Sequence, residues 1–290
     1  MPTLSKSLRI NLLLLLLILG LFLLLQLPAP EQKQTASSPP LSNIAVDTIQ
    51  SIRLERGPND DIVLQKQDGQ WWMRSPLNWP ANPARIQSLL ALLQAPVYGH
   101  FSSQQQNLAS LGLQPPQASI KLDHTTLHFG STEALNHRRY LQLGDDIYMV
   151  DEASFYQVIA IVARYLSPRL LREEERITAL SLPGLQLTQQ QGTWHSSVAG
   201  THADDIIALL QQWQTVNALS VDQAEGIDTQ GKPRIRLSLS TQTLPLEFAI
   251  VQQQPDLLLL RLDNQLLYQL HPHQAQMLLQ LNPSPSPVDK

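Results

Sequence analysis

The sequence contains no cysteine. This absence excludes disulfide bonds, thiolate nucleophiles, thiolate zinc sites and the lipidated cysteine of a lipoprotein. The sequence is also poor in charge: Asp, Glu, Lys and Arg make up 15% of the 290 residues, well below the usual share of about a quarter. The net charge is −4, and the basic residues form no cluster of the kind that contacts a phosphate backbone. We therefore expect no nucleic-acid partner.

Motifs for nucleotide binding and for hydrolysis are missing as well. There is no G-x-G-x-x-G segment, no Walker loop and no G-x-S-x-G elbow. Paired carboxylates occur at 60–61, 145–146 and 204–205, but each pair falls at a predicted turn or in a first helical turn, where Asp is favoured for local reasons. Because no acid, base and nucleophile converge, we expect a non-catalytic protein without a cofactor.

Histidines offer no convincing metal site. His124 and His128 have a spacing that would suit a metal ion on a helix, but they lie in a predicted hairpin, where that spacing does not bring two side chains together. Strand alternation turns His128 away from the core, towards solvent. His271 and His273 flank a predicted helix start without a third ligand, so a role in the helix cap is the simpler interpretation. We expect no bound metal.

One hydrophobic run is long enough to cross a bilayer. Residues 8–27 are almost entirely apolar, and twenty helical residues rise about 30 Å, the thickness of the hydrocarbon core. Lys6 and Arg9 lie at its start, and no positive charge follows until Lys33. The positive-inside rule then places residues 1–7 in the cytoplasm and the bulk of the chain in the periplasm, anchored in a bacterial inner membrane. A cleaved signal peptide is the alternative, which the long run and the poor cleavage site disfavour.

A pattern of strand, turn, Trp, polar segment and helix occurs twice, in residues 49–95 and again in 177–216. An internal repeat indicates one supersecondary design used twice. Each copy continues with the alternating apolar residues of strands and closes with a helix, so each reads β-β-β-α and then β-β-β-β-α. We expect an α+β fold: an N-terminal transmembrane helix, then two tandem repeats of mostly antiparallel sheet with packed helices.

Composition places the boundaries between these parts. Residues 28–44 are rich in Pro, Ser and Gln and predict a flexible linker. The first repeat unit is expected at 45–171 and the second at 172–282, with a disordered tail at 283–290. The charged run at 172–176 joins the two units, and we predict that it is a solvated link.

Local signals place several elements. Asp68-Gly69 is a dipeptide favoured in tight hairpins. Asn82 followed by Pro83 predicts the start of a helix, with Asn82 as the N-cap. Apolar periodicity predicts a further helix over 153–166, at the end of the first unit.

Tryptophan supplies the candidate contact residues. Trp71 and Trp72 are adjacent in a predicted strand, so they point to opposite faces. Trp194 stands alone at the place that corresponds to Trp71, and we therefore expect Trp71 in the core. Trp72 and Trp79 are the candidate partner or ligand surface, because exposed aromatic rings suit protein or sugar contacts. Packing of these rings on nearby prolines or on the neighbouring unit is the competing interpretation.

Several of these segments together resemble the domain of unknown function 4340 family. The resemblance covers most of the first unit and, more loosely, the second. Members often carry one N-terminal membrane helix and are often accessory components of ABC-type export or gliding-type transport machinery in the envelope; the resemblance implies the same role here and carries over no catalytic residue. The segments that carry it are 49–55, 62–66, 69–72, 75–76, Ala81, 89–93, 111–113 with Pro115, 129–130, Tyr140 and 148–150.

The expected function is therefore positional. An anchor, a linker and two sheet units would present surfaces to a protein partner in an envelope complex, possibly a transport complex, without catalysis. The alternative is a periplasmic solute- or glycan-binding protein that uses a cleft between the two units, with Trp72 or Trp79 as the platform.

Overall fold

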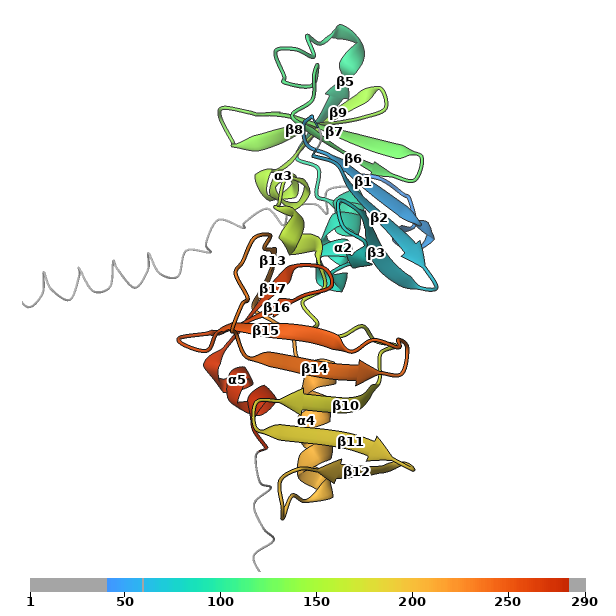
Figure 1. Cartoon of the computed structure of the whole chain (residues 1–290). Coiled ribbons are helices and arrows are strands. Elements are labelled where there is room, and N and C mark those ends of the chain that lie inside the picture. Colours follow the sequence, from blue (N-terminus) through green and yellow to red (C-terminus); the bar gives the residue numbers. More distant parts are fainter. Residues whose placement is uncertain (1–40, 59, 282–290) are drawn as a thin grey trace, which may run out of the picture. The chain divides into compact units, whose positions relative to one another are not determined.

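The computed structural model describes residues 41–58 and 60–281 (Figure 1). These described residues belong to one compact unit, which contains two antiparallel sheets. The expected transmembrane segment 8–27, nearly all of the linker 28–44 and the tail 283–290 lie outside the described residues. Within the described part of the chain, no helix is long and apolar enough to span a bilayer. The α+β class with two sheet units is confirmed, and the domain boundaries stay predictions.

The first sheet has nine strands in the order β4-β3-β2-β1-β6-β7-β8-β9-β5. Its strands are β1 (Ser51–Glu55), β2 (Ile62–Gln67), β3 (Gln70–Ser75), β4 (Trp79–Pro80), β5 (Gly99–Ser102), β6 (Ala118–Leu122), β7 (Thr125–Thr132), β8 (Arg138–Leu143) and β9 (Asp146–Asp151). The second sheet has eight strands in the order β12-β11-β10-β14-β15-β16-β17-β13. Its strands are β10 (Ile177–Leu182), β11 (Leu185–Gln190), β12 (Thr193–Ser196), β13 (Ser220–Gln223), β14 (Arg234–Leu239), β15 (Leu246–Gln252), β16 (Leu257–Arg261) and β17 (Leu266–Leu270).

The helices are few and short, and each sheet has two α-helices (Figure 1). In the second sheet, Trp213 of α4 is fully buried against Phe248 of β15, with ring centroids 5.8 Å apart. The indole Nε1–H of Trp213 donates to Leu278 O of α5 at 3.0 Å, so both helices are fastened together over that sheet. The helices are α2 (Pro83–Leu90), α3 (Glu152–Val158), α4 (Ala203–Thr215) and α5 (Pro272–Leu279), and the 3₁₀ helices are η1 (Val46–Thr48), η2 (Ala91–Gln94), η3 (Ser103–Gln105) and η4 (Val162–Tyr165).

The two sheets share one strand order. Apart from β4, the order β3-β2-β1-β6-β7-β8-β9-β5 corresponds strand for strand to β12-β11-β10-β14-β15-β16-β17-β13. The second unit has one strand more than the sequence pattern indicates, and the first has two, of which β4 has no counterpart in the second sheet. The additional strands β5 and β13 follow the first helix of their unit and pair with the last strand of their own sheet. These strands are short edge strands, and their partners lie far along the chain, so local periodicity does not reveal them.

Local signals explain most of the hairpins and helix starts. In β1, Ile52 and Leu54 are fully buried while Arg53 and Glu55 are exposed, as alternation predicts. The β2–β3 turn has positive φ at Asp68 (49°) and Gly69 (81°), the conformation that two-residue hairpin turns require. The matching β11–β12 turn has φ of 48° and 82° at residues 191 and 192. Asn82 caps α2, because its side chain accepts a hydrogen bond from Ala84 N at 3.1 Å.

The helix expected over 153–166 is wrong in its extent. Helix α3 ends at Val158, the chain is extended at Ile161 (ψ 151°), and η4 begins at Val162. The Tyr165 hydroxyl donates to Val158 O at 3.0 Å and so satisfies a carbonyl at the end of α3. A tertiary contact from one side chain thus replaces the continued helical hydrogen bonds.

Candidate functional site

The segment 165–176, which we call the connector, joins the two sheets. Tyr165 O accepts from Asn82 N at 2.7 Å, and Ser167 N donates to Pro80 O at 2.8 Å, which ties the connector to the edge of the first sheet. Its next residue, Pro168, accepts from Ala218 N at 2.9 Å, just before β13 of the second sheet. The connector is therefore hydrogen-bonded to both halves of the described structure.

The charged end of the connector contains a buried carboxylate, and for this residue the prediction of a solvated link is wrong, whereas Glu173, Glu174 and Arg176 are exposed. Glu175 is fully buried. Its Oε2 accepts from Arg172 N at 2.7 Å, and its Oε1 lies 3.0 Å from Arg172 Nη2 and 3.9 Å from Arg261 Nη2. A carboxylate loses hydration when it is buried, so it needs these cations and donors around it.

Arg261, at the end of β16, is the cation at the centre of this network. Its side chain is 2% exposed and makes two hydrogen bonds to Asp263, at 2.8 and 3.0 Å. Nη1 donates to Leu170 O of the connector at 2.9 Å. The Cζ atom lies 4.5 Å from the centroid of the Trp79 ring of the first sheet, within the range of cation–π attraction. One arginine of the second sheet thus contacts the connector and the first sheet together.

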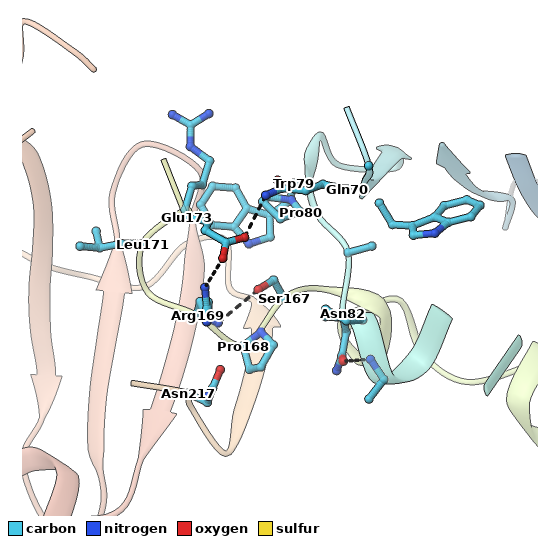
Figure 2. Close-up of a pocket in the computed structure, with 16 residues that line it drawn as sticks. Gln70, Trp79, Pro80, Asn82, Ser167, Pro168, Arg169, Leu171, Glu173 and Asn217 are labelled. Atoms are coloured by element: carbon cyan, nitrogen blue, oxygen red, sulfur yellow. Dashed lines mark hydrogen bonds and ion pairs between the residues drawn. The ribbon is translucent and has the colours of Figure 1, made fainter. Parts of the chain in front are cut away.

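A cavity of about 550 Å³ lies beside this network, and we call it the junction cavity (Figure 2). It is bounded by the β3–β4 edge, the start of α2, the connector and Asn217, which lies between α4 and β13. Cavities of this size hold small ligands in other proteins. The residues that matter below are Gln70, Trp71, Trp79, Asn82, Glu173 and Asn217.

Charged groups at the junction cavity are already paired. Glu173 accepts a hydrogen bond from Gln70 Nε2 at 2.9 Å and lies 3.8 Å from Arg169 Nη1, as the dashed lines of Figure 2 show. Arg172 pairs with Glu175, described above, and with Glu174 at 3.6 Å. No cationic side chain of this wall is therefore left for an anionic ligand.

A second cavity, of about 420 Å³, borders helix α2, and we call it the helix cavity. Its wall includes Lys66, Ile86, Gln87 and Gln94. The two cavities share Gly69, Trp71 and Pro83 in their walls. Trp71 is therefore the aromatic residue that borders both spaces.

The predicted contact residues have different surroundings. Trp79 is 5% exposed, so it is a buried wall of the junction cavity and no open platform. Trp72 is half-buried, and Arg74 covers its ring with Cζ 5.4 Å from the ring centroid. Trp71 packs against the hydrophobic core with part of its surface, as expected from its match to Trp194, which packs in the same way.

Strand register confirms the match between the two tryptophans. Trp71 is the second residue after the β2–β3 turn and pairs with Lys66. Trp194 is the second residue after the β11–β12 turn and pairs with Gln189. The residue after Trp194 is His195, which is exposed. Trp72 and His195 therefore lie on the outer faces of their own sheets.

Two buried donors near Arg261 have no hydrogen-bond acceptor among the described residues: Trp79 Nε1 and the Tyr268 hydroxyl. Burial raises the pKa of the Tyr268 hydroxyl well above its usual value, so this group stays protonated at neutral pH. A buried donor without an acceptor is costly, by about 1–3 kcal/mol.

The histidines lie apart from this region of the structure. His124 is exposed, and His128 Nδ1 lies 2.8 Å from Ser119 Oγ. His271 is the N-cap of α5, and its backbone N donates to Gln274 Oε1 at 3.0 Å, which fits the cap interpretation. Over the described residues, no group of three or more His, Asp or Glu side chains is placed to hold a metal ion.

The paired carboxylates have local partners. Asp61 lies 3.1 Å from Arg53 Nη1, and Asp60 pairs with Arg56. Asp204 and Asp205 fall in the first turn of α4, where the helix dipole favours negative charge. Sequence reasoning missed the network of Glu175 and Arg261, although a charged residue ending an apolar strand, LLLLR, was a signal that could have pointed to Arg261.

Comparison with known proteins adds a family and no function. The family model for a domain of unknown function (DUF4340) matches residues 71–230, from β3 of the first sheet to the segment before β14 of the second. The match spans more than half of the 290 residues. No curated protein and no solved structure matched the sequence. The chain therefore belongs to the domain of unknown function 4340 family.

Proposed function

We propose that the protein is a non-catalytic accessory component of a bacterial envelope complex, such as an ABC-type transport complex. The apolar run at 8–27 supports an inner-membrane anchor, and the positive charges at its start support a cytoplasmic N-terminus with the bulk of the chain in the periplasm. The described part of the chain then acts by presenting a surface to a protein partner.

The observation that carries this proposal is an exposed apolar patch, the 156–161 patch. Tyr156, Ile159 and Ile161 are 58%, 37% and 63% exposed and lie within six residues of one another. Clustered apolar side chains at a surface are typical of protein contact sites, whereas single ones are common everywhere. The backbone of this patch is fixed, because Arg56 donates a hydrogen bond to Ala160 O.

The experiment is site-specific cross-linking of the full-length protein in membranes, followed by pull-down of the wild type and of Ile161→Asp. We expect a membrane transport subunit to cross-link near residue 161 in the wild type and to be lost in the variant. Leu244→Asp is the matched control, because Leu244 is 79% exposed and lies outside the patch. Equal recovery from all three proteins, or equal loss in both variants, would contradict the proposal.

Topology is tested separately with a reporter fused after Lys290. We expect activity from a reporter that works only in the periplasm. Activity from a reporter that works only in the cytoplasm would overturn the proposed orientation, whatever the cross-linking shows.

A second candidate function is binding of a small solute or glycan. The junction cavity favours it, because aromatic and amide side chains line one space. Titration of the full-length protein with saccharides and short peptides, followed by tryptophan fluorescence, tests it. A spectrum that no probe changes at millimolar concentration contradicts binding there.

A further inference from the structure

Two ligand-sized cavities meet at shared wall residues. The junction cavity and the helix cavity have volumes of about 550 and 420 Å³, and both have Gly69, Trp71 and Pro83 in their walls. Trp71 is half-buried, packs partly on the core and borders both cavities. A ligand that crosses this ring would occupy both spaces, and only an extended molecule can do so.

Amide side chains are spread along the same path. Gln70, Asn82 and Asn217 border the junction cavity, and Gln87 and Gln94 border the helix cavity. Amides both donate and accept hydrogen bonds, as sugar hydroxyls do. An aromatic ring flanked by amides suits the apolar face and the hydroxyl rim of a pyranose.

The charges along the path favour a neutral ligand. The cations of the junction cavity are paired within the protein, as described above. In the helix cavity one cation, Lys66, and one anion, Asp47, balance each other. A phosphate or carboxylate ligand would therefore meet no unbalanced positive charge.

The first-sheet edge beside Trp71 is closed to an added peptide strand. Strand β4 contains Pro80, which has no N–H, and Pro80 O already accepts from Ser167 N at 2.8 Å. On either side, Ala81 N donates to Trp71 O at 2.8 Å and Asn82 N to Tyr165 O at 2.7 Å. A strand-like peptide binds a sheet edge through backbone hydrogen bonds. The backbone groups named above are already bonded, so a ligand here must be recognised by side chains.

We propose that a neutral, linear oligosaccharide binds across Trp71, with one part in the junction cavity and the next part along helix α2. This inference deepens the second proposed function, on which it rests, by naming the ligand class and by moving the platform from Trp72 and Trp79 to Trp71. It does not depend on the protein contact at the 156–161 patch.

The test is titration of the full-length protein with maltohexaose, cellohexaose and chitohexaose, each compared with its monosaccharide and with a deca-proline peptide. Calorimetry measures binding, and tryptophan fluorescence reports the site. We expect at least one hexasaccharide to bind about tenfold or more tightly than its monosaccharide, because it uses both cavities.

Four variants locate the site. Trp71→Ala should raise the Kd about tenfold, and Trp71→Phe should restore part of the affinity because a ring remains. Gln87→Ala removes an exposed side chain of the helix cavity, so it should weaken hexasaccharide binding without affecting folding. Trp72→Ala is the matched control on the opposite face of β3, and its Kd should equal that of the wild type. Thermal unfolding confirms that each variant is folded.

Each other outcome decides against the extended site. Binding of the proline peptide alone would assign the path to peptides. Equal losses of affinity in Trp71→Ala and Trp72→Ala would contradict the role of Trp71 as the platform. A monosaccharide that binds as tightly as its hexasaccharide, with loss in Trp71→Ala and none in Gln87→Ala, would leave solute binding in the junction cavity standing and overturn the extended site. If no saccharide and no peptide binds, the extended site and the second proposed function both fail. Partner capture at the 156–161 patch remains a separate result.

Discussion

The two sheets have the same strand order but bury their charge in different places. In the first sheet, Arg139 at the start of β8 is 6% exposed, pairs with Glu152 of α3 and lies 3.9 Å from the Phe155 ring centroid. In the second sheet, the buried arginine is Arg261, at the opposite end of the corresponding strand β16. Arg139 fastens a helix to its own sheet, whereas Arg261 reaches the connector and Trp79. A repeated topology therefore does not repeat its polar contacts, and the junction depends on a residue outside the shared pattern.

The largest effect is expected for Arg261→Leu. Removing this cation leaves the carboxylate of Glu175 buried with one partner fewer, and breaking a buried pair costs about 3–5 kcal/mol. Urea unfolding of the full-length protein measures the change in the free energy of unfolding. Arg236→Leu is the control, since Arg236 is 58% exposed and pairs with Glu247 on the surface, so its loss should cost less than about 1 kcal/mol. Similar costs in the two variants would contradict a special role for the junction.

A smaller loss, about 2–3 kcal/mol at neutral pH, is expected for Arg139→Leu, because Glu152 keeps partial contact with water. The side-chain hydrogen bond from Arg139 lowers the pKa of Glu152 below its usual value of 4.5. A carboxyl with a lowered folded pKa stabilises the protein above pH 4.5, and this contribution is lost as the pH falls through the folded value. In Glu152→Gln the unfolding free energy should therefore vary less with pH below 4.5 than in the wild type. An unchanged pH profile would contradict the pairing.

Trp71→Ala and Trp194→Ala should have similar costs, about 2 kcal/mol each, because both indoles are half-buried on their cores at matching positions. Trp72→Ala and His195→Ala remove outer-face side chains and should each cost less than about 1 kcal/mol. Thermal unfolding of the four variants makes the comparison. A cost for Trp72→Ala as large as that for Trp71→Ala would reverse the assignment of faces.

The smallest effect concerns the break between α3 and η4. Tyr165→Phe removes the hydroxyl that bonds to Val158 O, at a cost of about 1 kcal/mol. Burial raises the pKa of Tyr165 to about 12 from its usual 10.0. The neutral phenol is thus favoured in the folded state, so wild-type stability should fall as the pH rises from 10 towards 12. The Phe variant should show less of this alkaline decline in denaturant unfolding.

Much of the architecture was predictable from local patterns. Apolar alternation explains β1 and β14, in which every second residue is buried. The cap at Asn82 and the turn at Asp68-Gly69 are local too, since each depends on residues a few positions apart. Edge strands β5 and β13 were missed, because their pairing partners β9 and β17 lie far along the chain.

The candidate site was predictable only in part. The assignment of Trp71 to the core and of Trp72 to the outer face followed from its match to Trp194 and from strand alternation. Exposure could not be inferred for Trp79, which lies in a two-residue strand and is covered by an arginine of the other sheet. Helix 153–166 was overextended because the Tyr165 hydroxyl competes for the end of α3.

By itself the sequence determined most of the secondary elements, the α+β class and the division into two repeat units, because these depend on periodicity and on turn chemistry within short segments. Only the tertiary structure decided that Glu175 is buried, that Trp79 forms an inner wall and that Trp71 borders two cavities. Those properties depend on contacts between residues far apart in the chain. The sequence of a charged run such as 172–176 is the same whether the run is solvated or covered by a neighbouring sheet. Its burial therefore depends on what packs against it.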